Sequence, residues 1–322
     1  MKVLVIFTGG TIGSSVKGKW VSVDDVPPFA LLSRYNDTDD EFVTSAPYSV
    51  LSENLSSEQI NVLQKEIEKN LDKGFDGIIV THGTDTLQYA ACAAEFAFGN
   101  SDIPIVFVSA DFPLENEATN GFVNFEAAME FIKSSAQGGV FVSYKNDDKN
   151  EVDIHIPSRI LSHGECDPNL YSIDKKIFAS YKDGKIQKNM ELKDEISPIG
   201  VVEYARDSKI LCVDSYPANS YLYSLDDVDA VILKPYHSAT LNTANEKLVD
   251  FCNRAKKANI PVFVVNVKSN LMYESSKEFN ELNINVLPYG TFISSYMKIW
   301  AGLSLEKDLN TFMKAPIAFE IV

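Results

Sequence analysis

Two segments of the chain place threonine, glycine and aspartate directly after a short apolar run. They are residues 8–13 (T-G-G-T-I-G) and residues 81–86 (T-H-G-T-D-T). A threonine hydroxyl can act as a nucleophile in acyl transfer when a neighbouring group helps to remove its proton. Thr11 and Thr84 are therefore candidate catalytic residues. Asp85, next to Thr84, can supply the negative charge that orients a lysine or a substrate ammonium group.

Glycines precede both threonines, Gly10 before Thr11 and Gly83 before Thr84. Glycine tolerates positive φ and lets backbone N–H groups approach a substrate closely, as an oxyanion hole requires. Each feature also has a structural interpretation, because Thr84 or Asp85 can cap a following helix and the glycines can relieve a tight turn. The presence of both segments in one chain favours the functional interpretation, with Gly10 and Gly83 in the substrate site.

The elements that must position these residues follow from the hydrophobic pattern. Short apolar runs alternate with longer amphipathic segments in the N-terminal half, which is typical of parallel strands covered by helices. Ser56 and Gln59 form a capping box before apolar residues at helical spacing, so a helix is expected between the first two strands. A second helix is expected over 86–98, ended by Gly99 in a left-handed conformation. The clearest predicted strands are 3–7, 77–80, 105–108 and 140–143.

The predicted fold class is α/β, with a larger N-terminal flavodoxin-like domain around a parallel sheet and a smaller C-terminal α/β domain. In such open sheets, ligands bind outside the carboxyl ends of the strands, so both threonine segments are expected at the same edge. The composition turns polar over 182–198, with Asp183-Gly184 as a turn. We therefore expect domains over 1–185 and 201–322, joined by a linker at 186–200. In the second domain we expect strands at 201–204, 230–233 and 262–265 and helices near 245–257 and 305–314.

Charge and cysteine usage limit the possible partners. The chain has 45 acidic and 29 basic residues, so its net charge of -16 would repel a nucleic-acid backbone. No apolar stretch approaches the ~18 residues of a membrane span, and the first apolar run lacks a signal-peptide cleavage site. The cysteines are scattered without a paired motif, as expected for reduced thiols. We expect a cytoplasmic protein that binds neither nucleic acid nor membranes.

Several common chemistries lack their motifs. Residues 13–19 fit the phosphate-loop pattern, but Trp20 follows where Ser or Thr must bind Mg²⁺, and 21–28 cannot open a helix. The dinucleotide-binding glycine pattern and the Gly-x-Ser-x-Gly elbow of serine hydrolases are absent. The four histidines show no metal-ligand spacing. We expect no metal and no cofactor.

The T-G-G-T-I and H-G-T-D-T segments resemble the two signatures of the bacterial L-asparaginase family, and the likeness runs over essentially the whole chain. It is closer to the cytoplasmic (type I) members than to the secreted ones. The resemblance implies an asparaginase-like two-domain fold and a homodimer or homotetramer with active sites at subunit interfaces. It also implies an amidohydrolase that converts L-asparagine, or a related small carboxamide, to L-aspartate and ammonia. A threonine nucleophile forms the acyl-enzyme that water then hydrolyses.

The resemblance also assigns roles to residues of this sequence. By position, Thr11 is the nucleophile, and Thr84 and Asp85 are the second threonine and the aspartate of the supporting triad. Ser52 falls where the family has a serine that holds the substrate α-carboxylate. Glu53 falls where secreted members have glutamine and cytoplasmic members a second serine. A carboxylate in the pocket would repel an α-carboxylate and attract an ammonium group, which would move the specificity away from free asparagine. The alternative is that Glu53 points into solvent, as most glutamates do.

Three positions depart from the family pattern. The family has Gly-x-Arg-x-x-Lys, whose lysine joins the triad, whereas residues 157–162 here place Ser162 at the lysine position. Loss of a positioned proton-transfer group typically costs about 10²–10⁴ in rate. Trp20 stands nearest the tyrosine of the mobile loop, and its indole N–H cannot accept a proton. Residues 118–121 (A-T-N-G) stand where Arg-Ser-Asp-Gly is usual, which is expected to loosen the neighbouring structure.

Two other functions follow from these observations. Ser162 and Trp20 suggest a catalytically impaired asparaginase-like protein that binds a small amino acid. The amidase subunit of a tRNA-dependent amidotransferase shares the family fold. Those subunits carry an extra domain before the first threonine segment, whereas Thr11 lies near the start here, and the acidic surface suits tRNA poorly. The amidohydrolase is the preferred hypothesis.

Overall fold

The computed structural model describes two compact units. The first comprises Met1–Glu203 with Ile317–Phe319, and the second comprises Tyr204–Pro316 with Glu320–Val322. The predicted linker at 186–200 lies just before this division, and the predicted domain boundaries stay a prediction. The structure describes all residues except 14, 18–19, 23–28, 36–38, 135–136, 193–194 and 267–272, and describes only the backbone of 15–17, 20–22, 29–30 and 266.

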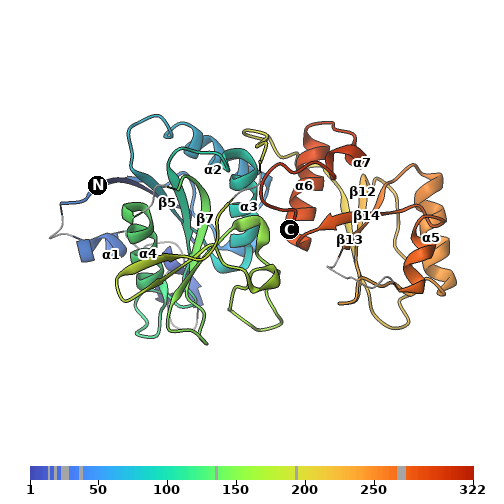
Figure 1. Cartoon of the computed structure of the whole chain (residues 1–322), viewed down its shortest axis with the longest axis horizontal. Coiled ribbons are helices and arrows are strands. Elements are labelled where there is room, and N and C mark those ends of the chain that lie inside the picture. The colour runs from blue at the N-terminus through green and yellow to red at the C-terminus, as the bar shows by residue number, and fades with distance from the viewer. Residues whose placement is uncertain are drawn as a thin grey trace. The chain divides into compact units, whose positions relative to one another are not determined.

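An eight-stranded sheet in the order β10-β9-β8-β7-β6-β5-β1-β4 forms the centre of the first unit (Figure 1). The strands from β4 to β7 are parallel, and β8, β9 and β10 extend the sheet antiparallel. Central strands rich in valine and isoleucine are buried on both faces, as expected for a parallel sheet covered on both sides. The strands are β1 (Lys2–Phe7), β4 (Glu41–Ser45), β5 (Gly77–Thr81), β6 (Pro104–Val108), β7 (Gly139–Tyr144), β8 (Val152–His155), β9 (Ala179–Lys182) and β10 (Lys185–Lys188).

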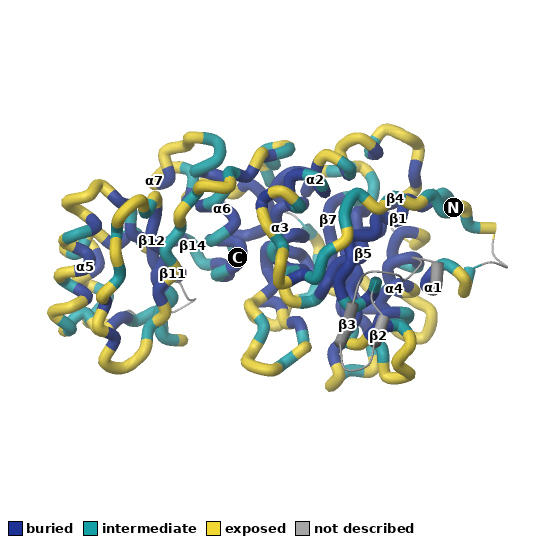
Figure 2. The backbone as a smooth tube through the Cα atoms, turned by 180° about the vertical axis from the view of Figure 1, so that it is seen from behind, coloured by how far each residue is buried: buried dark blue, intermediate teal, exposed yellow. Residues whose placement is uncertain are grey.

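Helices cover both faces of this sheet. The α4 helix (Gly121–Ser134) packs in one apolar core, and α2 (Ser57–Glu68) and α3 (Leu87–Phe98) pack in the other. Figure 2 shows the buried backbone of the central strands beneath them. The predicted capping box is present, because the Ser56 hydroxyl accepts from the Glu58 N–H and the Ser56 N–H donates to Gln59. A short helix α1 (Phe29–Leu32) and the strands β2 (Ser15–Lys17) and β3 (Trp20–Ser22) complete this unit.

The predicted left-handed cap at Gly99 is wrong. The α3 helix does end before Gly99, but the φ of Gly99 is −58°, which is right-handed helical backbone. Crowding explains the glycine better: a Cβ there would lie 2.8 Å from the Glu95 carbonyl oxygen and 3.1 Å from the Ile196 side chain. At this position the small size of glycine matters, and not its backbone freedom.

The second unit contains a four-stranded parallel sheet in the order β11-β12-β13-β14. The predicted strand at 201–204 is absent, and β11 begins the sheet instead. The final helix predicted near 305–314 is present but shorter, since α7 covers only part of that range, and the long helix α6 before it was not predicted. The elements are β11 (Ile210–Asp214), β12 (Ala230–Lys234), α5 (Glu246–Lys257), β13 (Val262–Asn266), β14 (Ile284–Tyr289), α6 (Phe292–Ser304) and α7 (Leu309–Phe312).

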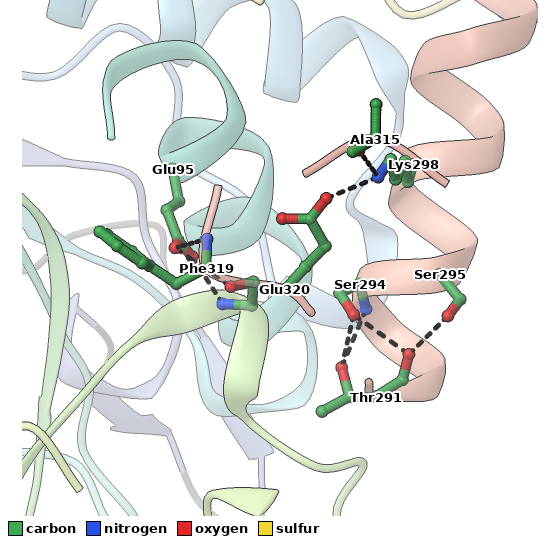
Figure 3. Close-up of polar contacts among 9 residues, drawn as sticks. Glu95, Thr291, Ser294, Ser295, Lys298, Ala315, Phe319 and Glu320 are labelled. Carbon is green, nitrogen blue, oxygen red and sulfur yellow. Dashed lines mark hydrogen bonds and ion pairs between the residues drawn. The ribbon is translucent and has the colours of Figure 1, made fainter. Parts of the chain in front are cut away.

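Buried charged side chains anchor the end of the chain (Figure 3). In the first unit, the Phe319 N–H donates to the fully buried Glu95, and Arg159 donates to the Phe319 carbonyl at 2.8 Å. In the second unit, Lys298 pairs with Glu320 at 2.6 Å, and their side chains are only 2% and 5% exposed. Buried charges are costly unless they are paired or hydrogen-bonded, so these contacts fix the C-terminal residues in place.

The structure confirms the predicted fold class, with a larger parallel-rich sheet and a second, smaller α/β sheet. Within the described part of the chain, no helix is both long enough and apolar enough to cross a membrane.

Candidate functional site

The two threonine segments meet because β1 and β5 are neighbouring parallel strands. Phe7 pairs with Thr81, so residues 8–13 and 82–86 leave the sheet side by side at the same edge. The Thr8 hydroxyl donates to the Thr81 carbonyl oxygen at 2.7 Å and ties the two strand ends together. The predicted convergence at one sheet edge is therefore present.

Gly10 and Gly83 are in direct backbone contact. A Cβ on Gly10 would lie 2.3 Å from both the Cα and the N of Gly83, and Gly10 has a φ of +73°. No other residue type meets both conditions, since a side chain would clash and positive φ strains an L-residue. This contact sets how closely the loops carrying Thr11 and Thr84 approach each other.

The Gly10 N–H is not available as an oxyanion donor. It donates to the Val50 carbonyl oxygen at 2.9 Å, and the Val50 N–H donates to the Thr8 carbonyl at 3.1 Å. Gly9, with a φ of +95°, would place a Cβ 2.4 Å from the same Val50 oxygen. The glycine pair therefore locks the first threonine loop against residue 50, a position that no sequence motif indicates.

Ser52 brings a third segment to the same place. Its hydroxyl oxygen would lie 2.4 Å from a Cβ on Gly83, and its carbonyl accepts from the Thr86 hydroxyl at 2.8 Å. Ser52 is buried, whereas the next residue, Glu53, is exposed. Three segments, 8–13, 50–54 and 82–86, thus form one contiguous surface with Ser52 wedged against the glycine of the second threonine loop.

The candidate catalytic residues are accessible from solvent. Thr11 and Thr84 are half-buried, and Asp85 is exposed at the start of the short helical turn Thr84–Thr86. Asp85 and Thr84 make no side-chain cap on the following α3 helix, whose N-cap residue is Thr86 without a capping side-chain bond. The capping interpretation of this segment therefore does not account for its residues.

His82 forms the buried support beneath this surface. Its N–H donates to the Val108 carbonyl at 2.9 Å, and its own carbonyl accepts from the Ser109 hydroxyl at 2.7 Å. Its Nδ1 lies 2.9 Å from the Gly83 carbonyl oxygen. Burial lowers the pKa of His82 to about 4, so the ring is neutral at pH 7 and Nδ1–H donates to Gly83. His82 thereby holds the second threonine loop.

The segment that departs from the family motif lies next to the second threonine loop. Ser162 is exposed, and the preceding Arg159 is buried and bonded to the chain end. The following residue, His163, approaches the loop: its Nε2 lies 3.2 Å from the Thr84 carbonyl oxygen. Sequence reasoning missed His163, because only its adjacency to the aligned lysine position pointed to it.

The other two departures have different outcomes. The Trp20 side chain lies outside the described residues. The backbone of β3 (Trp20–Ser22) pairs antiparallel with β2. A strand therefore stands where a phosphate loop would be followed by a helix. At 118–121, Asn120 accepts from the Asp111 N–H and donates to the Lys145 carbonyl, both at 2.9 Å. These bonds tie Asn120 to two neighbouring segments, and the expected loosening stays a prediction. Among the described residues, no cluster of histidine, cysteine, aspartate or glutamate side chains is arranged to hold a metal ion.

Solved asparaginases share this architecture. The chain superposes on the thermostable L-asparaginase from Thermococcus kodakarensis with a TM-score of 0.77 at 21% sequence identity, covering 100% of this chain and 99% of the other. For L-asparaginase I from Vibrio cholerae the TM-score is 0.78 at 18% identity, again covering 100% and 99%. At such low identity these similarities establish the fold only.

The curated proteins that resemble this chain in sequence are amidotransferase subunits, whereas the solved structures are asparaginases. A glutamyl-tRNA(Gln) amidotransferase subunit from Methanosarcina mazei is 26% identical over 286 residues, which are 82% of this chain and 63% of that protein. The amidotransferase subunit of the same name from Methanosphaera stadtmanae is 24% identical over 320 residues, covering 92% of this chain and 71% of the relative. The chain thus spans less than two thirds of the length of the first of these relatives.

A family model matches the N-terminal half of the chain. The model of the family described as Asparaginase, N-terminal matches residues 2–162, which contain β1, β5 and all three segments of the candidate site. This match covers half of the 322 residues. The chain belongs to the asparaginase family.

Proposed function

We propose that this protein is an amidohydrolase that cleaves the side-chain carboxamide of L-asparagine, or of a related small amide, to a carboxylate and ammonia. The observation that carries the proposal is the contact between Gly10 and Gly83, which joins the two threonine loops into one surface. Membership of the asparaginase family supports the same reaction class. The named substrate and the roles of individual residues are the finer part of the proposal.

In the proposed reaction, the Thr11 hydroxyl oxygen attacks the amide carbon while its proton passes to the Thr84–Asp85 side of the site. The C–N bond then breaks, and ammonia leaves with a proton. Water attacks the resulting ester, which releases the carboxylate product and returns the proton to Thr11. Since the Gly10 N–H is already used by Val50, the oxyanion must be held by other N–H groups of the two loops.

Ser52 and Glu53 are proposed to select the substrate. The Ser52 hydroxyl lies against Gly83, and we propose that it donates to a substrate carboxylate. The exposed Glu53 carboxylate next to it repels that group and attracts an ammonium group. We therefore expect Glu53→Ser to improve kcat/KM for free asparagine relative to amides that lack an α-carboxylate.

The direct test is ammonia release by purified protein from asparagine, glutamine and small amide analogues. Thr11→Ala should abolish the release, and Thr44→Ala, at an exposed position on β4, serves as the matched control. Absence of turnover with every amide, together with no effect of Thr11→Ala, would refute the proposal.

The curated relatives favour a second function, the ammonia-releasing subunit of a tRNA-dependent amidotransferase. The net charge of -16 opposes direct contact with a nucleic-acid backbone, so any tRNA would have to be held by a partner protein. Ammonia release that increases only when glutamyl-tRNA and a partner are added would support this function. Full turnover by the isolated chain would support the free amidohydrolase.

The exposed Ser162 motivates a third function, binding of a small amino acid without hydrolysis. Calorimetry would then show tight binding of aspartate or asparagine while no ammonia is released. Measurable turnover that depends on Thr11 would exclude this function.

A further inference from the structure

Ser52 contacts both ends of one short turn. The helical turn Thr84–Thr86 follows Gly83, where a Cβ would lie 2.4 Å from the Ser52 hydroxyl oxygen. Three residues after Gly83, the Thr86 hydroxyl donates to the Ser52 carbonyl oxygen at 2.8 Å. The side chain of Ser52 thus lies against the beginning of the turn that carries Thr84 and Asp85, and its backbone is bonded to the end of that turn.

The Thr86 hydroxyl is not used as threonines at helix starts usually are. An N-cap threonine normally accepts a hydrogen bond from an N–H of the first helical turn, which stabilises the helix. Thr86 is the N-cap residue of α3 and makes no such bond. In contrast, Thr291 caps α6 by accepting from the Ser294 N–H at 3.1 Å. The same residue type therefore caps one helix but, at the start of α3, bonds to a segment 34 positions away.

The Ser52 hydroxyl is placed to serve a ligand. Ser52 is only 6% exposed, and its backbone carbonyl is hydrogen-bonded, but its hydroxyl has no hydrogen-bond partner among the residues that the structure describes. A buried hydroxyl without a partner is unfavourable, so such a group is expected to be satisfied by water or by a bound molecule. This hydroxyl is therefore a donor that a substrate oxygen can use.

We propose that Thr86 is a positioning residue for substrate binding. Its bond to the Ser52 carbonyl holds the 52–54 segment in the orientation that presents the Ser52 hydroxyl to a substrate carboxylate. The same turn carries Thr84 and Asp85, so a substrate held by Ser52 is placed relative to the proposed catalytic residues. The inference rests on the proposed amidohydrolase function and on the part that Ser52 has in it.

Thr86→Val tests this role, because it removes the hydroxyl and keeps the shape of the side chain. It should raise KM for asparagine at least about fivefold and change kcat less than about twofold, since binding is weakened while the reacting groups are unaltered. Thr86→Ser, which retains the donor, should keep KM within about twofold of the wild type. Amides without an α-carboxylate should keep their KM in Thr86→Val, because they do not use Ser52.

A double-mutant cycle separates positioning from a general loss of stability. In a Ser52→Ala background, Thr86→Val should raise KM no further, because both changes remove the same interaction with the substrate. Thr291→Val, which removes the N-cap of α6 in the second unit, is the matched control. It should lower the urea midpoint of unfolding and leave KM unchanged.

The Thr86→Val variant is expected to fold. The Ser52 carbonyl oxygen also accepts from the Leu55 N–H at 3.0 Å, so the substitution does not leave this oxygen without a donor. If Thr86→Val nevertheless fails to fold, Thr86→Cys replaces it, because a thiol is a weak donor and should raise KM in the same direction.

The outcomes distinguish this inference from the proposed function. An active wild type whose KM for asparagine is unchanged in Thr86→Val, or rises just as much in the Ser52→Ala background, overturns the role of Thr86 and leaves the amidohydrolase intact. If the wild type releases no ammonia from any amide, the proposed function fails, and calorimetry with aspartate then tests Thr86 separately. Weaker aspartate binding by Thr86→Val than by the wild type would support its role, whereas equal binding, or no binding by the wild type, would overturn it.

Discussion

Single residues determine how closely the two threonine loops approach, and Gly10 is the most constrained of them. We expect Gly10→Ala to destabilise the protein by more than the roughly 1–2 kcal/mol that positive φ costs an L-residue, since its Cβ would also lie 2.3 Å from Gly83. Ammonia release should be lost. Gly74→Ala is the matched control, because Gly74 has a φ of +69° with no atom within 4 Å. Urea unfolding and activity assays should therefore show a stability cost alone for Gly74→Ala, and equal behaviour of the two variants would contradict the packing argument.

His82 predicts a pH dependence of stability. Its folded-state pKa of about 4 lies below the ordinary histidine value of about 6.5, because the ring is buried. Between these pH values the unfolded chain binds a proton that the folded chain does not, so the free energy of unfolding falls as the pH is lowered from 6.5 to 4. The full effect is roughly 3 kcal/mol.

Unfolding measured from pH 7 to pH 4 checks this prediction. His82→Asn should flatten the slope relative to the wild type, whatever its overall stability, whereas the exposed His237→Asn should leave the slope unchanged. Parallel slopes for His82→Asn and the wild type would show that His82 titrates normally in the folded protein.

The local features of the site can be predicted from the sequence, whereas its long-range contacts cannot. Glycine next to threonine after an apolar run identifies Gly10, Thr11, Gly83 and Thr84, because backbone freedom and hydroxyl chemistry are properties of residue type. Val50 and His163 cannot be found in this way. Their roles come from contacts with residues about 40 and 79 positions away, and no local pattern encodes such contacts.

At the scale of elements, the Asp183-Gly184 turn joins two strands of the large sheet, whereas its polar surroundings suggest the approach to a linker. The sequence predicts Asp183-Gly184 as a turn within the polar stretch before the linker, but both residues have positive φ and form the two-residue turn between β9 and β10. An aspartate-glycine pair between extended segments is a strong hairpin signal. The exposed, lysine-rich β10 hides the hairpin, because an edge strand lacks the apolar residues used to find strands.

The α3 helix illustrates an element held by one buried carboxylate. Glu95 is fully buried and accepts from the Ser158 N–H at 2.6 Å, the Ser158 hydroxyl at 3.1 Å and the Phe319 N–H at 3.3 Å. Glu95→Ala removes the acceptor of all three donors and should lower the free energy of unfolding by about 3–5 kcal/mol. Glu68→Ala, at an exposed position of α2, should change it by less than about 0.5 kcal/mol. Denaturant unfolding measures both, and a small effect of Glu95→Ala would mean that water replaces the carboxylate.

At the scale of the whole molecule, the last residues of the chain serve both compact units. Phe319 belongs to the first unit, where Arg159 donates to its carbonyl oxygen, and Glu320 belongs to the second, where it neutralises the buried Lys298. Deletion of residues 317–322 should therefore destabilise both units, by exposing the Glu95 side of the first and by leaving Lys298 buried without its carboxylate in the second.

Hydrogen exchange followed by mass spectrometry can resolve the two effects. The deletion should increase exchange in peptides from α3 and in peptides from α6, whereas Glu320→Gln, which removes only the charge paired with Lys298, should increase exchange in α6 alone. Phe319 and Glu320 are adjacent in the chain, yet Phe319 bonds to Glu95 in the first unit and Glu320 bonds to Lys298 in the second. Faster exchange of α3 in Glu320→Gln would show that the two units unfold as one cooperative body, and unchanged exchange of α3 in the deletion would show that the first unit does not depend on the chain end.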